Sequence, residues 1–147
     1  MSRYIRRNVG PGAWEGVEPL DYKEEGSAPF RAISRQVLFD GSASQLRYFE
    51  VAPGGYSTLE RHEHTHAVLI LRGRGSCLIG SEIHLVARHD LVEVPPLTWH
   101  QFRAAADEPL GFLCMVDSQR DRPQLPDASA LAELQQDPAI RAFLAGD

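Results

Sequence analysis

Short hydrophobic runs, each ended after a few positions by turn-forming residues, fill the chain from residue 30 to residue 120. The breaks between the runs are rich in Gly, Pro, Asp and Ser, and the runs themselves include RQVLF, QLRYFEV, HAVLILR, IHLV, DLVEV, HQFRA and LGFLCMV. Many short, closely spaced strands are typical of a β-sandwich or a closed barrel. Because closure removes exposed strand edges, we predict an all-β fold with one barrel over residues 30–120.

The two ends of the chain have different patterns. Residues 1–29 are rich in Gly, Pro and charge and lack the period of a helix or strand, so they are predicted to form an arm held on the barrel by Trp14 and Tyr22. Residues 121–147 contain PDASALAELQQ and DPAIRAFLAGD, and each has an aspartate in an N-cap position. This end is predicted to form a C-terminal extension of two short helices outside the barrel.

Composition and charge narrow the class of function. The chain has 147 residues, enough for one domain with its own core, and a net charge of −5, which argues against a general nucleic-acid-binding protein. Its two cysteines are too few for a disulfide framework, and no run approaches the ~20 apolar residues of a membrane span. The basic start is followed by no apolar segment and does not resemble a secretory signal. We expect a soluble, cytoplasmic protein with reduced thiols that binds a small molecule.

Residues of the kind that bind metal ions alternate in the segment LERHEHTH. If this segment is a strand, Glu60, His62, His64 and His66 share one face, because successive side chains point to opposite faces. The three imidazoles would repel one another when protonated, and they would need many hydrogen-bond partners when neutral and buried. A divalent cation satisfies all of them together. A surface or hydrogen-bonded core position, the usual alternative for a single histidine, explains the group less well.

This segment and a later one resemble the two motifs of the cupins, a family of small jelly-roll β-barrel proteins. The first motif, G-x5-H-x-H-x3–4-E-x6-G, aligns without a gap over residues 54–73, with Glu60 in place of the first histidine and His66 in place of the glutamate. The second, G-x5-P-x-G-x2-H-x3-N, aligns over residues 89–104 with two glycines and the asparagine replaced. The resemblance implies a cupin barrel that binds one divalent metal ion through Glu60, His62, His66 and His100.

The position of His64 leaves an alternative open. A second alignment uses His62 and His64 as the histidine pair, with a shortened loop, and frees Glu60 from the site. In the ungapped alignment His64 instead lies beside the metal as a proton carrier, or faces solvent in a turn. Three imidazoles and one carboxylate leave two octahedral positions open, as in catalytic sites. Such ligands suit Fe(II), Mn(II), Ni(II) or Zn(II), and the resemblance favours manganese.

One cysteine and several arginines are further candidates for chemistry. Cys114, in the strand LGFLCMVD, is either a small buried hydrophobe or, if it faces inward, a thiol activated by a nearby cation. Arg103, Arg120 and Arg122 are candidates for binding an anionic substrate, because arginine offers a planar fork to phosphate or carboxylate.

Beyond the motifs, YSTLERHEHTHAVLILRGRG, PPLTWHQFRA and LGFLCMVDSQRDRPQLP are similar to a narrower bacterial group of cupins. Members of this group transfer the methylthio group of S-methyl-1-thioxylulose 5-phosphate to glutathione. The resemblance implies a metal-dependent transferase with glutathione as co-substrate. In the mechanism that we expect, either His64 or a metal-bound hydroxide is the base that removes a proton beside the ketone, and either glutathione or Cys114 is the thiol that attacks the methylthio sulfur. Two other interpretations remain: another metal-dependent cupin reaction, such as a dioxygenase or a sugar isomerase, and a non-catalytic small-molecule-binding domain. Cupins are often dimers, so we expect a homodimer.

Overall fold

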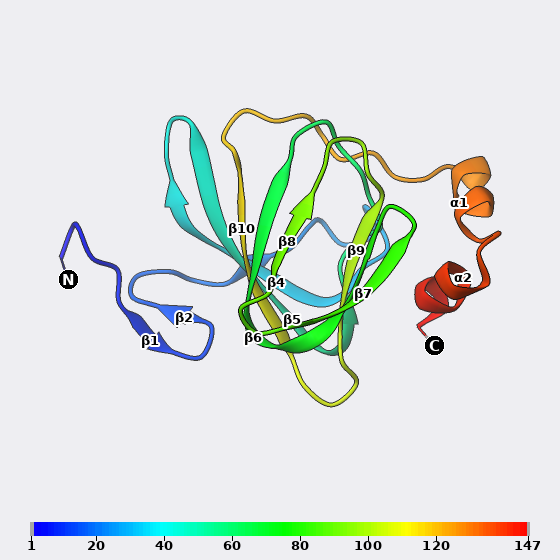
Figure 1. The fold of residues 1–147 in the computed structure, drawn as a ribbon. Coiled ribbons are helices and arrows are strands. Elements are labelled where there is room, and N and C mark those ends of the chain that lie inside the picture. The colour runs from blue at the N-terminus through cyan, green and yellow to red at the C-terminus, as the bar shows by residue number, and fades with distance from the viewer. Residues whose placement is uncertain (1, 147) are drawn as a thin grey trace.

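A computed structural model describes residues 2–146 and shows a closed β-barrel with an N-terminal arm on one side and two short helices on the other (Figure 1). None of the helices in this described part is long and apolar enough to cross a membrane. The elements, in chain order, are β1 (Asn8–Gly10), β2 (Ala13–Trp14), β3 (Leu20–Asp21), β4 (Arg31–Asp40), β5 (Ser44–Tyr56), β6 (His66–Ile79), β7 (Glu82–Ala87), β8 (Leu91–Val94), β9 (His100–Ala104), β10 (Leu110–Asp117), α1 (Ala128–Leu134) and α2 (Pro138–Ala145).

The barrel closes through two strands that each join β5 to β6. Strand β10 pairs with both of them along most of its length, and β9 pairs with both at the other end. The long strand β6 bends between its two halves at Gly73, where φ is 68° and an added Cβ would lie 1.8 Å from the carbonyl oxygen of Pro109. Glycine alone fits such a position, and it lets β6 pair with β8 before the bend and with β7 after it.

Alternating side chains of the strands fill the barrel. Phe49 of β5 stacks on Phe112 of β10 with ring centroids 5.5 Å apart, and Phe102 of β9 lies 4.9 Å from the same ring. Burial of one such side chain stabilises the fold by about 1.5–3 kcal/mol. These rings and the valines around them occupy part of the interior, and the polar side chains described below line a cavity in another part.

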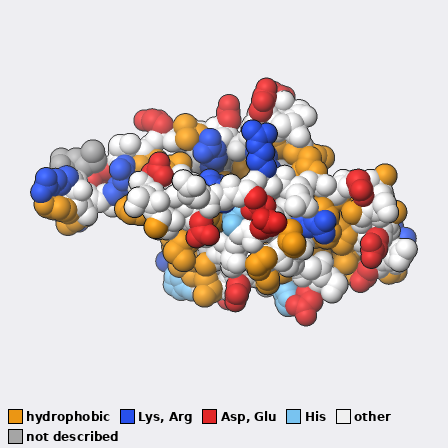
Figure 2. Space-filling view, turned by 90° about the horizontal axis from the view of Figure 1, so that it is seen from above, with side chains coloured by type: hydrophobic (Ala, Val, Ile, Leu, Met, Phe, Trp, Pro, Cys, Tyr) orange, Lys and Arg blue, Asp and Glu red, His pale blue; other side chains and the backbone are white. Residues whose placement is uncertain are grey.

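Two aromatic residues hold the arm on the barrel, as its sequence predicts. Trp14 packs edge-on against Tyr48 of β5, with centroids 4.9 Å apart, and Tyr22 packs in the same way against Phe49 at 5.9 Å. Strand β3 pairs antiparallel with β4 and so extends the sheet. The tip of the arm projects beyond the barrel and exposes basic and hydrophobic side chains (Figure 2). Tyr4, near the start of the arm, is 79% exposed.

The two C-terminal helices begin where the sequence predicts. Asp127 accepts a hydrogen bond from the amide of Ala130 to cap α1, and Asp137 caps α2 through the amide of Ala139. Ile140 and Phe143 of α2 are buried against Leu78 of β6. Helix α2 therefore covers part of the outer surface of the barrel and leaves the interior free.

Candidate metal centre and its cavity

The segment before β6 is not the continuous strand that its alternating residues suggest. Glu60 and Arg61 form isolated bridges, and residues 62–65 bend before β6 begins at His66. The side chains of His62, His64 and His66 nevertheless lie together, because their rings stack on one another across the bend. The ring centroids of His62 and His66 lie 4.3 Å apart, and those of His62 and His64 lie 3.7 Å apart.

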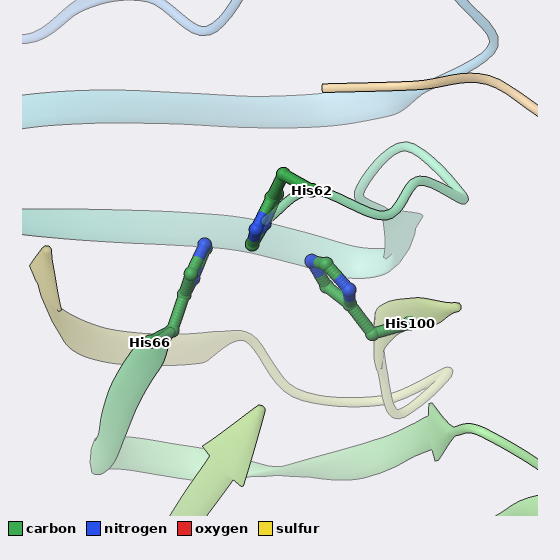
Figure 3. Close-up of side chains that lie close together, drawn as sticks. All are labelled: His62, His66 and His100. Atoms are coloured by element: carbon green, nitrogen blue, oxygen red, sulfur yellow. The ribbon is translucent and has the colours of Figure 1, made fainter. Parts of the chain in front are cut away.

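Three buried histidines from two parts of the chain converge at one point (Figure 3). His66 is the first residue of β6, and His100 is the first residue of β9. His62 lies in the bend that precedes β6. One potential ligand atom of each residue lies within 4.8 Å of those of the other two. His100 reaches this point because its backbone pairs with that of Glu60 in both directions.

Hydrogen bonds set the tautomers of these histidines. Nδ1 of His62 lies 2.7 Å from the carbonyl oxygen of His64, and Nδ1 of His100 lies 2.9 Å from that of Thr98. Since a carbonyl only accepts, each Nδ1 carries the proton and donates it, which leaves a lone pair on each Nε2. The Nε2 atoms of His62 and His66 are buried and have no hydrogen-bond partner among the described residues. Buried lone pairs without a partner are costly, and a bound cation satisfies them.

The protonation states of the histidines also suit a cation. Burial, with the other histidines adding repulsion, lowers the pKa of His62 to about 4 and that of His66 to about 2. Burial likewise lowers the pKa of His100. All three imidazoles are therefore neutral at pH 7, which is the form that binds metal ions. The residues present fit a divalent cation held by nitrogen ligands.

Glu60, expected as the fourth ligand, lies beside the three histidines, but its carboxylate is bound to another residue. Its Oε2 pairs with the ammonium group of Lys23, which the arm carries to the same cavity. The structure thus brings together His62, His66 and His100, and places the Glu60 carboxylate next to them in an ion pair. The sequence contains no local signal for Lys23, because the two partners are 37 residues apart.

His64 lies inside the protein and is held by an acidic residue that the sequence analysis missed. Its Nδ1 lies 2.8 Å from Oδ1 of Asp121, in the loop after β10. The Asp121 carboxylate also accepts hydrogen bonds from the backbone amides of Glu63 and His64. Together with the His64 ring, these donors hold the pKa of Asp121 well below its usual range. Asp121 therefore fixes both the bend and the His64 ring. With a separation of 57 residues, this pair leaves no local trace in the sequence.

Cys114 faces inward from β10. Its Sγ lies 3.1 Å from Nδ1 of His66 and 3.6 Å from Nη2 of Arg47. Burial raises the pKa of the thiol, and the guanidinium of Arg47 acts in the opposite direction. Since the sulfur lies on the Nδ1 side of the His66 ring, Nε2 of that ring stays free for a cation.

All of these side chains line one cavity of about 340 Å³, a size suited to a small metabolite. Part of its wall is apolar and includes Phe49, Phe102 and Phe112. Another part carries positive charge and includes Lys23, Arg35, Arg47 and Arg120.

Of the three arginines expected to bind an anion, the structure brings one to the cavity. Arg120 lines it, whereas Arg122 is exposed to solvent outside it. Arg103 lies on the outer face of β9, where it stacks over Tyr56 and donates to the carbonyl oxygen of Leu144 in α2. Strand alternation explains this, since Arg103 is an odd number of positions from the inward-facing His100.

Comparison with known proteins finds β-barrel proteins that are similar to this chain along most of its length. The family model for the cupin domain matches residues 47–116. A Rhodospirillum rubrum protein named 1-methylthio-D-xylulose 5-phosphate methylsulfurylase is 60% identical over 135 residues, which cover 90% of this chain and 86% of that protein. A crystal structure of a cupin 2 conserved barrel domain protein from Rhodopseudomonas palustris is similar, with a TM-score of 0.90, 55% identity and coverage of 95% and 97%. A cupin-2 domain structure from Rhodospirillum rubrum has a TM-score of 0.87, 56% identity and coverage of 98% of both chains.

Proposed function

The chain belongs to the cupin family, and on this premise we propose that it is a metal-dependent enzyme that removes the methylthio group from 1-methylthio-D-xylulose 5-phosphate. This compound is the same as S-methyl-1-thioxylulose 5-phosphate, the substrate that the sequence resemblance implies. The observation that carries the proposal is the arrangement of three neutral imidazoles next to a thiol inside one cavity. The name of the 60% identical relative supplies the substrate. The positive charge along the cavity suits a phosphorylated sugar.

His62, His66 and His100 would hold the divalent cation, with Glu60 as a fourth ligand if its carboxylate leaves Lys23. The sequence resemblance favours manganese, and Fe(II), Ni(II) and Zn(II) suit the same ligands. When bound, such a cation supplies Lewis acidity that stabilises negative charge on a ketone oxygen. The same cavity has an apolar wall of phenylalanine side chains, which would limit the access of water to a bound substrate.

The proposed transfer is an attack by a thiol sulfur on the methylthio sulfur of the substrate. A new S–S bond forms while the C1–S bond breaks, and the electron pair of the broken bond passes through C1 into the ketone as an enolate. A proton then adds to C1 and gives the methyl group of 1-deoxyxylulose 5-phosphate. The carbon is thereby reduced by two electrons, and two thiol-level sulfurs are oxidised to a mixed disulfide.

Two residues of the cavity have places in this scheme. Cys114 is the attacking thiol in one branch, after which glutathione exchanges with the Cys114 methyl disulfide and carries the methylthio group away; in the other branch glutathione attacks directly. His64, held through Nδ1 by Asp121, donates the proton that adds to C1 from its other nitrogen. Asp121 acts as a positioning residue because it holds the His64 ring through Nδ1 and the bend through the amides of Glu63 and His64.

The test begins with the metal content of the purified protein, followed by addition of the methylthio sugar phosphate and glutathione. We expect 1-deoxyxylulose 5-phosphate and the methyl disulfide of glutathione in equal amounts, measured by NMR and mass spectrometry. A chelator should stop the reaction, and Mn²⁺ should restore it. A substrate that stays unchanged with each of the four metal ions and glutathione present would refute the proposal.

A further inference from the structure

Two arginines occupy positions on the inner face of the barrel where apolar residues usually lie. Arg47 of β5 has the same orientation along its strand as Phe49 and Val51, and it pairs with Cys114 of β10. Arg35 of β4 pairs with Phe49. Both line the cavity that contains the histidines. An inward-facing guanidinium loses hydration, so these positions require a compensating interaction.

Within the part of the chain that the structure describes, the interactions of Arg47 leave its charge without an anionic partner. Its Nη2 lies 3.6 Å from the sulfur of Cys114, and its guanidinium stacks over the Phe49 ring at 4.9 Å. Its Nε is buried and has no hydrogen-bond partner among the described residues. The side chain is therefore held in place by packing while part of its hydrogen-bonding capacity is unused.

Among the described residues, the hydrogen bonds of Arg35 and Arg120 go to neutral oxygens. Nε of Arg35 donates to the backbone carbonyl of Asp21, while Arg120 donates to the carbonyl of Asp117 and to the side chain of Gln45. Within residues 2–146, no carboxylate oxygen lies within 4.0 Å of the guanidinium of Arg35, Arg47 or Arg120. Burial, with repulsion from the other two guanidinium groups, lowers the pKa of Arg120.

The acidic side chains of the cavity are already engaged elsewhere. Glu60 pairs with Lys23, and Asp121 with His64. The protein thus gathers three positive charges on one side of its cavity although its net charge is −5. We propose that Arg35, Arg47 and Arg120 form a binding site for the phosphate group of a small phosphorylated ligand.

The charge and shape of a phosphate monoester match this site better than those of a carboxylate. At pH 7 a phosphate monoester carries about −1.5 to −2 charges and presents three acceptor oxygens, enough to engage several guanidinium groups. The sulfur of Cys114 contacts both Arg47 and His66, so these two side chains lie close together. One small molecule can therefore reach the arginines and the histidines at the same time. The identification of this anion as the phosphate of the methylthio sugar rests on the proposed function.

The test measures phosphate binding and turnover separately. Inorganic phosphate is titrated into the wild-type protein by calorimetry at low ionic strength, and the titration is repeated with Arg35→Gln, Arg47→Gln and Arg120→Gln. We expect each substitution to weaken phosphate binding about 10-fold or more, because it removes a charged hydrogen-bond donor. The control Arg88→Gln removes one charge from the exposed turn between β7 and β8 and should bind phosphate as the wild type does. Circular dichroism and thermal melting show that each variant is folded, and Arg47→Lys, which keeps the charge, should recover part of the affinity.

Equal phosphate affinities in Arg47→Gln and Arg88→Gln would overturn the site. Turnover separates this inference from the proposed reaction. If the wild type binds phosphate through these arginines but leaves the methylthio sugar phosphate unchanged, the reaction is wrong and the phosphate site stands. If the wild type turns over the substrate and the three arginine variants change KM no more than Arg88→Gln does, the reaction stands and the phosphate site is wrong.

Discussion

Acidification should destabilise the metal-free protein through its buried neutral histidines. In the folded protein burial lowers the pKa of His62 to about 4 and that of His66 to about 2, whereas both regain a pKa of about 6.5 on unfolding. Below about pH 6.5 the unfolded chain therefore binds protons that the folded protein does not, and unfolding becomes more favourable. The stability is fully present above that pH and is lost as the pH falls, for His62 until about pH 4. At pH 5 linkage gives a loss of about 2 kcal/mol for each of the two histidines.

Urea unfolding of the metal-free protein, followed by tryptophan fluorescence at about pH 7, 6 and 5, measures this loss. In His62→Gln the side chain does not titrate, so the decrease in the free energy of unfolding between pH 7 and 5 should be smaller by about 2 kcal/mol. His84→Gln is the matched control, because its side chain is 55% exposed, and it should keep the wild-type decrease. A His62→Gln variant that loses as much stability as the wild type would refute the assignment of buried neutral imidazoles.

The remaining predictions concern the barrel bend and the catalytic side chains. Gly54→Ala should lower the free energy of unfolding by about 1 kcal/mol, since φ is 75° and no atom lies within 4 Å of the new Cβ. Gly73→Ala should lower it by about 3 kcal/mol or more, because φ is 68° and a carbonyl oxygen would lie 1.8 Å from the new Cβ. Equal losses of the two variants in urea unfolding would contradict the steric argument. Asp121→Asn should reduce kcat about 10- to 100-fold by loosening His64 while the metal content measured by mass spectrometry stays the same, and a parallel loss of metal would contradict this role. Cys114→Ser should abolish release of the deoxyketose phosphate, and unchanged turnover would assign the attack to glutathione alone.

The barrel and the helices could be predicted because local patterns determine them. Short apolar runs divided by turn residues give the strands, and Asp127 and Asp137 stand at the starts of the two helices. Gly73 is a motif position whose positive φ and close contact with the backbone explain why no other residue serves there. Each of these features depends on residues that are near one another in the chain, or on a backbone conformation that one residue type allows.

The partners of the site residues could not be predicted in this way. Lys23 reaches Glu60, and Asp121 reaches His64, only after the barrel has formed, and neither pairing has a local pattern. Strand parity, by contrast, was available in the sequence. Arg47 is separated from Phe49 and Val51 by even numbers of positions, so its side chain faces inward with theirs. Arg103 is an odd number of positions from His100, so its side chain faces outward.

The cavity combines a fixed side with an adjustable side. Cys114 and Arg47 face each other across the ladder of β10 and β5, and His66 and His100 each begin a barrel strand, so hydrogen-bonded strands hold the sulfur, a guanidinium and two imidazoles. On the opposite side, the arm and the loop after β10 supply the partners that bind Glu60 and His64. Loops and arms open at lower free-energy cost than barrel strands do. If the proposed reaction holds, Arg35 and Arg47 bind the phosphate from hydrogen-bonded strands, and Arg120 reaches it from the loop after β10. The groups that handle the proton and the fourth ligand position are those that can adjust as the substrate enters.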